Sequence, residues 1–279
     1  MKTWPAPAKL NLFLHVLGRR PDGYHRLQTV FQFLDLCDEL SFAVDESGRV
    51  VRDYMLAGVP DDKDLCLRAA RLLQRETGCT GGVRIDLVKR IPAGGGLGGG
   101  SSDAATTLLA LNHLWGLGLD RPALAELGLR LGADVPVFVH GHAAWAEGVG
   151  ERLSPLEPPE RWYVVLCPPV HVSTASVFRD PQLTRPSPAI TIRDFREGRT
   201  RNDLEAVVRA RYPEVEAAIR DLSAFGPARM TGSGACVFLA VEDAAAGEAV
   251  LARRPGGCPG FVARGLNQHP LHRRLGEFA

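Results

Sequence analysis

A glycine-rich segment constrains this chain more than any other feature. Residues 92–103 read PAGGGLGGGSSD, with six glycines within the seven residues 94–100. So many glycines lose much chain entropy on folding, which is tolerated where the backbone must approach something closely. Backbone N–H groups of such a loop can converge on phosphate oxygens, and a helix that follows adds its positive end. We therefore predict a phosphate-binding loop.

Three other interpretations of this segment are available. It is not a Walker A loop, because no Lys precedes Ser101. Residues 94–99 match G-x-G-x-x-G, but a dinucleotide fold needs a buried parallel strand before the loop, and this strand alternates; Asp120 lies in a turn rather than at a strand end. A glycine-rich turn without a ligand needs only one or two glycines. The sequence favours phosphate binding over all three.

Two segments before the loop have the alternation of strands. In residues 9–16 the leucines and Val16 share one face, while Lys9, Asn11, Phe13 and His15 share the other, which predicts a half-buried strand. Turn chemistry at residues 20–23 predicts that a second strand begins at Tyr24 beside the first. Residues 83–91 alternate again, and sheets with a polar face are more often antiparallel.

The rest of the chain predicts an α+β organisation in two parts. Helices are expected at 104–114, at 122–131 after Asp120 and before Gly132, and from Pro136 onward. Proline-rich residues 155–159 mark a change, so we place domains at 1–152 and 153–279. The second part predicts a small α+β sandwich, with residues 181–201 as a loop. Its expected elements are strand 162–167, helices 204–211 and 215–225, strand 236–241, helix 244–253 and strand 261–266.

Composition excludes several classes of partner. Lys plus Arg number 33 and Asp plus Glu 32, so no overall charge attracts nucleic acid or an anionic membrane. The six cysteines lie too far apart for a zinc site or a redox dithiol. No run approaches the roughly 18 apolar residues of a membrane span, and Lys9, Asn11 and His15 interrupt any signal peptide. We expect a cytoplasmic protein without nucleic-acid or membrane partners.

Several motifs together resemble a known superfamily. PAGGGLGGGSSDAA resembles the phosphate loop of the GHMP kinases, which include galactose, homoserine and mevalonate kinases, and APAKLNLFLHV (6–16) and MTGSGACVF (230–238) resemble two more of their motifs. DGYHRLQTVFQFLDL, LGADVPVFVHGHAAWAEGVGE and NQHPLHR are similar to the branch that acts on a cytidyl diphosphate substrate. The similarity extends nearly from end to end.

The resemblance implies a two-domain α+β fold, with an N-terminal ATP-binding domain, a C-terminal ferredoxin-like domain and the active site between them. It implies an ATP-dependent kinase that phosphorylates the 2-hydroxyl of a methylerythritol linked to cytidine diphosphate, in the non-mevalonate isoprenoid pathway, with ATP as co-substrate and Mg²⁺ through unknown ligands. One alternative is a homoserine or mevalonate kinase, against which the GYH segment argues. Another is a non-catalytic nucleotide-binding module, against which Lys9 and Asp134 argue.

Two residues are candidates for the chemistry. Asp134 lies just before the helix begun by Pro136, and a carboxylate can accept or orient the proton of a hydroxyl. Its alternative role is a plain helix N-cap. Lys9 and Asn11 project to one face of their strand, where Lys9 would stabilise developing charge and Asn11 would hold the substrate. A solvated lysine is the alternative for Lys9.

The resemblance also implies residues for binding. Tyr24 and Phe178 would stack on the cytosine, and His25 would hydrogen-bond its edge. Thr231, Gly232 and Gly234 would support the phosphate loop. At the position of Asp64 many relatives carry Asn, whose amide donor Asp lacks. The implied ATP-binding residues are Asp64, Lys89, Pro92, Ala93, Gly94, Gly95, Gly96, Leu97, Gly98, Gly99, Gly100, Ser101 and Ser102.

Overall fold

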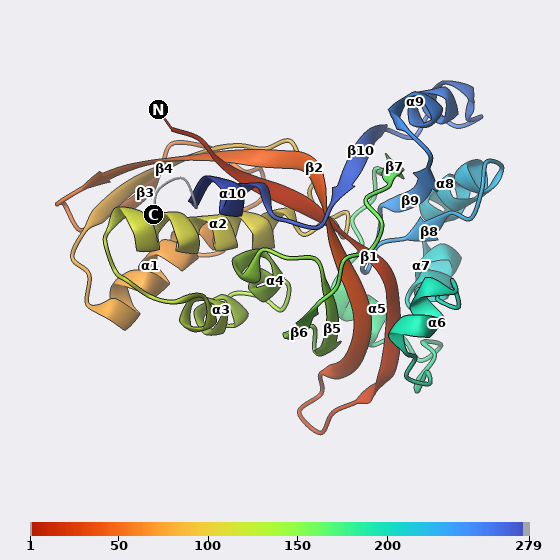
Figure 1. Cartoon of the computed structure of the whole chain (residues 1–279), viewed down its shortest axis with the longest axis horizontal. Helices are drawn as coiled ribbons and strands as arrows, with labels where there is room; N and C mark the ends of the chain where they lie inside the picture. Colours follow the sequence, from red (N-terminus) through yellow and green to blue (C-terminus); the bar gives the residue numbers. More distant parts are fainter. Residues whose placement is uncertain (1, 276–279) are drawn as a thin grey trace.

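A computed structural model describes residues 2–275, and in it the chain forms an α+β fold in which one sheet system runs through both halves (Figure 1). Helices α1–α4 lie beneath the strands of the first half, and α6–α9 flank the second. The elements of the first half are β1 (Trp4–Arg19), β2 (His25–Asp45), β3 (Val50–Arg52), α1 (Leu65–Thr77), β4 (Gly82–Val88), α2 (Gly99–Leu114), α3 (Arg121–Leu129), α4 (Val135–His140), β5 (Ala144–Gly148) and β6 (Arg152–Pro155).

The second half contributes a smaller antiparallel sheet with helices around it. Its elements are β7 (Trp162–Leu166), α5 (Thr174–Phe178), α6 (Ile192–Arg196), α7 (Glu205–Arg211), α8 (Pro213–Ser223), β8 (Arg229–Met230), β9 (Val237–Val241), α9 (Ala244–Arg253), β10 (Gly260–Leu266) and α10 (Pro270–Leu275). The strand order is β3-β4-β2-β10-β7-β9-β8, and β1 and β5 also pair with β2. Of the pairs between described strands only β3–β4 is parallel, so the predicted antiparallel sheet is confirmed.

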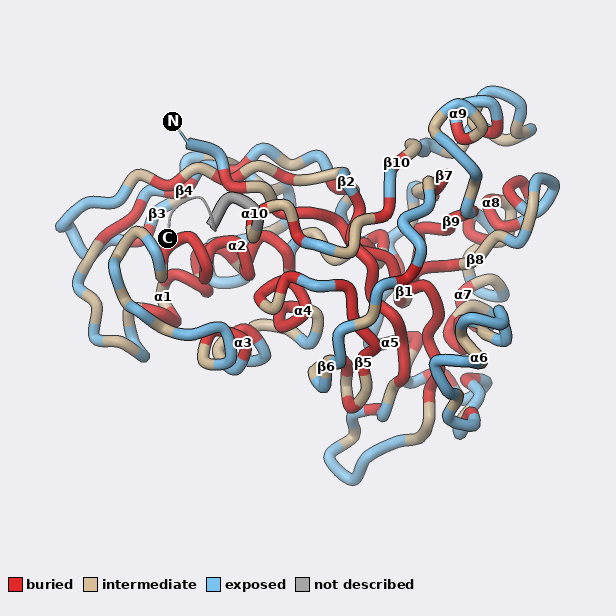
Figure 2. The backbone as a smooth tube through the Cα atoms, in the orientation of Figure 1, coloured by how far each residue is buried: buried red, intermediate tan, exposed pale blue. Residues whose placement is uncertain are grey.

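Strand β1 is longer and more buried than predicted. It pairs with β2 from Trp4 to Arg19, and its residues from Ala6 to Val16 are buried on both faces (Figure 2). The prediction of a half-buried strand was therefore wrong. The polar face is covered because the glycine loop and residues 231–236 lie against it: the Lys9 amide donates to the Leu97 carbonyl at 2.9 Å.

The helices follow local capping signals, with some differences at their ends. α3 begins after Asp120, whose side chain accepts from the Ala123 amide as an N-cap, and ends at Leu129, earlier than predicted. α2 begins at Gly99, inside the glycine run, rather than at residue 104. The predicted loop at 181–201 contains the short helix α6 with a Thr191–Asp194 capping box. None of the described helices is long and apolar enough to cross a membrane.

Helix α1 was not predicted, although its ends carry clear signals. The Asp64 side chain accepts from the amides of Cys66 and Leu67, and Gly78 ends the helix in the left-handed conformation at φ 69°. Buried Leu67 and Leu73 lie on the inner face of the helix, where they pack in the first core. An N-cap, an amphipathic pattern and a terminal glycine together are the sequence signature of such a helix.

The cores of the two halves share chain segments. The first core lies between the β1–β4 strands and helices α1 and α2, and it also contains Leu271 of α10. The second core lies around β7, β9, α7 and α8, and it contains Leu14 and Val16 of β1. The chain thus crosses between the halves more than once, and a domain boundary near residue 153 stays a prediction. Residues 276–279 of the C-terminal tail lie outside the described residues.

Candidate active site

A cleft of about 1090 Å³ lies where the glycine loop, the turn between β1 and β2, and the segment around α5 meet. It collects residues from both halves of the chain, so the predicted catalytic and cytosine-binding residues share one cavity with part of the glycine loop. The predicted site residues that do not line it are Asp64, Lys89, Pro92, Ala93, Gly95, Leu97, Ser102 and Thr231. The predicted site residues that line it are Lys9, Asn11, Tyr24, His25, Gly94, Gly96, Gly98, Gly99, Gly100, Ser101, Asp134, Phe178, Gly232 and Gly234.

The glycine loop is pressed against the turn at residues 231–236. Gly96 has φ 77°, and a Cβ on it would lie 2.4 Å from the Thr231 carbonyl oxygen, so a side chain is excluded there. Gly98, at φ 74°, is the left-handed N-cap of α2 and directs the chain into that helix. The Cys236 amide donates to the Gly95 carbonyl at 3.0 Å. The loop therefore presents its backbone and the positive end of α2 to the cleft.

The Lys9 ammonium is buried behind this loop, where it makes two hydrogen bonds and one ion pair. It donates to the Asn11 side-chain oxygen at 2.6 Å and to the Gly96 carbonyl at 2.9 Å, and it lies 3.2 Å from an Asp134 carboxylate oxygen. Its nitrogen also lies 5.5 Å from the centre of the Phe31 ring. The Lys9 side chain is 3% exposed, which rules out the alternative of a solvated lysine.

Asp134 precedes α4, but its side chain does not cap that helix. Its backbone is helical, at φ −85° and ψ −11°, and its carboxylate accepts no capping hydrogen bond. The side chain is 35% exposed, so one oxygen meets the Lys9 ammonium while the group remains open to the cleft. The geometry thus favours the interpretation of Asp134 as a cleft carboxylate over its interpretation as an N-cap.

A chain of hydrogen bonds orients the Asn11 amide, and its next member, Thr29, was missed by the sequence analysis. The Thr29 hydroxyl donates to the Phe13 carbonyl, and its oxygen accepts from the Asn11 side-chain nitrogen at 3.0 Å. The Asn11 oxygen is therefore the atom that faces Lys9. A threonine amid the apolar residues of β2 was the available signal.

The turn at residues 231–234 lies against the glycine loop. Thr231 is buried, and its hydroxyl accepts a hydrogen bond from the backbone amide of Asn11 at 2.8 Å. Gly232 and Gly234 adopt φ 56° and 85° and line the cleft. Asn202, also missed by the sequence analysis, donates from its side chain to the carbonyls of Met230 and Gly232. Residues far apart in the sequence thus fix this turn.

The predicted cytosine-binding residues form one corner of the cleft. Tyr24 is 65% exposed, whereas His25 is buried and its ring stacks on Phe178 with centroids 5.0 Å apart. Phe178 ends the short helix α5, which Ser173 caps. Burial, with Arg185 and then Arg19 nearby, lowers the pKa of His25 below its usual value. The corner therefore offers aromatic faces and a neutral imidazole.

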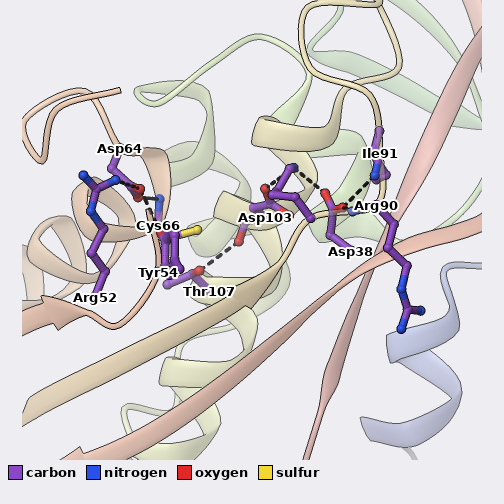
Figure 3. Close-up of polar contacts among 10 residues, drawn as sticks. Asp38, Arg52, Tyr54, Asp64, Cys66, Arg90, Ile91, Asp103 and Thr107 are labelled. Carbon is purple, nitrogen blue, oxygen red and sulfur yellow. Dashed lines mark hydrogen bonds and ion pairs between the residues drawn. The ribbon is translucent and has the colours of Figure 1, made fainter. Parts of the chain in front are cut away.

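Asp64 is buried in hydrogen bonds at the start of α1 (Figure 3). Its carboxylate accepts from the Arg52 guanidinium at 2.9 Å, from the Tyr54 hydroxyl at 2.8 Å, and from two amides of the helix. It does not line the cleft. Its contacts position α1, whose first residue, Leu65, does line the cleft.

Lys89 likewise lies outside the cleft lining and is held by two carboxylates. Its ammonium donates to Asp38 and, at 2.8 Å, to Asp103 of α2. Burial disfavours the charged ammonium, but Asp103 and Asp38 outweigh this and raise the pKa of Lys89. A Cβ on Gly99 would lie 3.2 Å from the ammonium, so Lys89 sits just behind the first residue of α2.

Within residues 2–275, no group of three or more His, Cys, Asp or Glu is arranged to hold a metal ion. Magnesium that arrives with a nucleotide usually needs only one or two protein oxygens besides phosphate. The cleft supplies these from Ser101 and Asp134, and the buried Ser102 hydroxyl has no hydrogen-bond partner among the described residues. The donor set therefore fits magnesium delivered by ATP.

Comparison with protein families matches both halves of the chain. The family described as GHMP kinases N terminal domain matches residues 64–142, and GHMP kinases C terminal matches residues 188–257. A solved homoserine kinase from Cytophaga hutchinsonii, 16% identical, aligns with a TM-score of 0.68 over 96% of this chain and 95% of that one. At that identity the likeness shows the fold alone.

Closer relatives share a single name. The 4-diphosphocytidyl-2-C-methyl-D-erythritol kinase of Pseudomonas syringae pv. syringae is 59% identical over 97% of this chain and 96% of its own length. That of Alkalilimnicola ehrlichii is 61% identical over 98% and 94%. A crystal structure of 4-(cytidine 5'-diphospho)-2C-methyl-D-erythritol kinase, 37% identical, aligns with a TM-score of 0.80 over 95% and 99%. This chain belongs to the 4-diphosphocytidyl-2-C-methyl-D-erythritol kinase family of the GHMP kinases, and is thus an ATP-dependent phosphotransferase that acts on a hydroxyl group.

Proposed function

We propose that this chain transfers the γ-phosphate of ATP to the 2-hydroxyl of 4-diphosphocytidyl-2-C-methyl-D-erythritol, a step of the non-mevalonate route to isoprenoid precursors. The substrate is the one in the names of its relatives. The observation that carries the chemistry is the 3.2 Å contact between the Lys9 ammonium and the Asp134 carboxylate, in the cleft that also holds the glycine loop.

Asp134 accepts or orients the proton of the 2-hydroxyl. As the hydroxyl oxygen bonds to the γ-phosphorus, the bond to the β-phosphate oxygen breaks and ADP leaves. The partial exposure of Asp134 leaves its carboxylate open to a substrate, and its lack of a capping hydrogen bond leaves its oxygens available. A positioned base of this kind contributes about 10²- to 10⁴-fold to a rate.

Lys9 stabilises the negative charge that develops on the attacking and transferred oxygens. Its ammonium is already held by Asn11, Gly96 and Asp134, so it needs little reorganisation at the moment of reaction. The ATP phosphates lie against the amides of the glycine loop and the start of α2. Ser101, Ser102 and Asp134 are the residues that would hold a magnesium ion delivered with ATP, and such an ion would add charge neutralisation at the phosphates.

The cytosine and the ATP depend on different residues of the cleft. Tyr24 and the free face of Phe178 stack on the cytosine, and His25 hydrogen-bonds it, since aromatic faces with a polar neighbour suit a planar base. Asp64 and Lys89 serve ATP indirectly, because each is saturated by protein contacts and fixes the start of a helix that borders the cleft.

Incubation with ATP, Mg²⁺ and the cytidyl substrate tests the proposal, with phosphorus NMR to detect the 2-phosphate. Homoserine and mevalonate form the comparison panel. We expect turnover of the cytidyl substrate and none of the other two. Turnover of homoserine or mevalonate with none of the cytidyl substrate would overturn the substrate assignment, and ATP binding without any transfer would favour a non-catalytic module.

A further inference from the structure

Arg185, in the segment between α5 and α6, joins two of the residues of the cytosine corner. Each of its three guanidinium nitrogens donates one hydrogen bond: Nε to the His25 Nε2 atom at 3.0 Å, Nη1 to the Asp180 carbonyl at 3.1 Å, and Nη2 to the Phe178 carbonyl. The side chain is half-buried and borders the cleft. None of the steps above uses it.

The direction of the hydrogen bond to His25 is fixed by chemistry. A guanidinium remains charged at any physiological pH and has donors but no acceptor. The Nε2 atom of His25 must therefore accept with its lone pair. A neutral imidazole that accepts at Nε2 carries its proton on Nδ1, and an imidazolium, with a proton on both nitrogens, cannot make this contact.

The charges around His25 also favour the neutral ring. Arg185 and Arg19 both face the ring, and together with burial they lower its pKa. Asp22, whose carboxylate accepts from the Tyr24 backbone amide, pairs with Arg20 at 2.7 Å. Asp180, whose carbonyl accepts from Arg185, pairs with Arg211. Phe178 covers one face of the ring. Nothing in this set stabilises a protonated ring.

We propose that Arg185 is a positioning residue that keeps His25 neutral with its proton on Nδ1, so that the ring always donates a hydrogen bond to the pyrimidine. Cytosine presents the acceptors N3 and O2 on its edge, and an obligate donor matches either. The same guanidinium holds the Phe178 carbonyl, so the end of α5 and the start of β2 keep a fixed separation. The identity of the pyrimidine rests on the proposed function; the state of the ring does not.

Long-range ¹H–¹⁵N correlation spectra of the full chain labelled with ¹⁵N-histidine test the ring directly, with His25→Asn to assign its signals. In the parent we expect a protonated Nδ1 and a bare Nε2 near neutral pH. Arg185→Met removes both the charge and every hydrogen-bond donor of the side chain, so the ring should populate both tautomers and become protonated at a higher pH. Arg185→Lys, which keeps the charge, should restore the pH of protonation in part but not the single tautomer.

Calorimetric titration with cytidine 5'-diphosphate tests the consequence for binding of the pyrimidine. Arg185→Met should weaken it about tenfold near neutral pH, the scale of one hydrogen bond to a charged or polar partner. The loss should shrink as the pH falls, because an imidazolium carries a proton on Nδ1 and can again donate from it. KM for the cytidyl substrate should rise in the same way while kcat changes little, and ATP affinity should be unchanged.

Arg179→Met is the matched control, because Arg179 also borders the cleft beside Phe178 but makes no hydrogen bond to His25 that the structure describes. Any loss of affinity in this variant should be independent of pH, with the tautomer unchanged. A parent ring that carries its proton on Nε2, or Arg185 variants with an unaltered tautomer and titration, would overturn the inference. Failure to phosphorylate the cytidyl substrate would sink the proposed function while leaving the spectra decisive for the ring.

Discussion

The two ends of the cleft differ in how far the protein has organised them. At the chemical end, Lys9 is 3% exposed, and its ammonium donates to Asn11 and Gly96, while Thr29 orients Asn11. At the cytosine end, Tyr24 is 65% exposed and Phe178 has one face against His25. The difference suggests that charge stabilisation is built in before substrate arrives, whereas base stacking is completed by the substrate.

Replacement of Asp134, the proposed general base, should have the largest effect on the rate. Asp134→Asn keeps the shape of the side chain but removes its basic charge, so we expect kcat to fall about 10²- to 10⁴-fold with a modest change in KM. A loose transition state would bring the loss towards the lower end of that range. Steady-state kinetics on protein shown by thermal melting to be folded is the measurement. A kcat within about twofold of the parent would remove Asp134 from the chemistry.

A substitution in the glycine loop should lower both the stability of the protein and its affinity for ATP. In Gly96→Ala the new Cβ meets the Thr231 carbonyl at 2.4 Å and requires a left-handed backbone, so the free energy of unfolding should fall by about 1–3 kcal/mol. ATP affinity should fall more than affinity for cytidine 5'-diphosphate. Gly257→Ala, where a Cβ meets nothing within 4 Å, is the control and should stay within about 0.5 kcal/mol of the parent. Equal loss of both ligands would contradict the assignment of the loop to ATP.

Removing an aromatic face should affect the open end alone. Phe178→Ala should weaken binding of cytidine 5'-diphosphate by about 1–3 kcal/mol, the scale of a base stacked on an aromatic ring, with little change in ATP affinity. Phe178→Leu keeps apolar bulk but has no aromatic face, so it separates stacking from packing against the second core. Calorimetric titration of each variant measures both affinities. An unchanged affinity in both variants would exclude Phe178 from the base site.

The smallest change probes the orientation of Asn11. Thr29→Val removes the hydroxyl that links Asn11 to the Phe13 carbonyl, so we expect stability to fall by about 1–3 kcal/mol and kcat to fall about tenfold. Thr29→Ser keeps the hydroxyl and should recover most of both. Denaturant unfolding and kinetics provide the comparison. If the Ser and Val variants behaved alike, the hydrogen-bond chain through Thr29 and Asn11 would not orient Lys9.

Local signals in the sequence predicted the loop, the pairing of β1 with β2, the Asp120 cap and most of the elements of the second half, because each depends on neighbouring residues. The burial of the polar face of β1 was not predictable in this way. It depends on residues 231–236, more than 200 positions away, which accept and donate across to Asn11 and the loop. Thr29 and Arg185 escaped for the same reason, since only the fold brings their partners to them. Asp64 was predicted to bind ATP through resemblance alone. Its hydrogen bonds to Arg52 and Tyr54 show a structural role that the motif does not reveal.

The exchange of segments between the two cores bears on how the protein is made. During synthesis the first half leaves the ribosome with its sheet and helices α1–α4, yet Leu271, one of its buried core residues, emerges only after the whole second core. In turn, Leu14 and Val16 of β1 are covered only once the residues of the second core, from Val164 to Val250, have been made. Domains generally fold as units during translation, N-terminal first. Here the nascent first half must carry uncovered apolar surface until Leu271 has emerged, so ribosome-stalled chains that end before residue 270 should depend on chaperones far more than the released protein does.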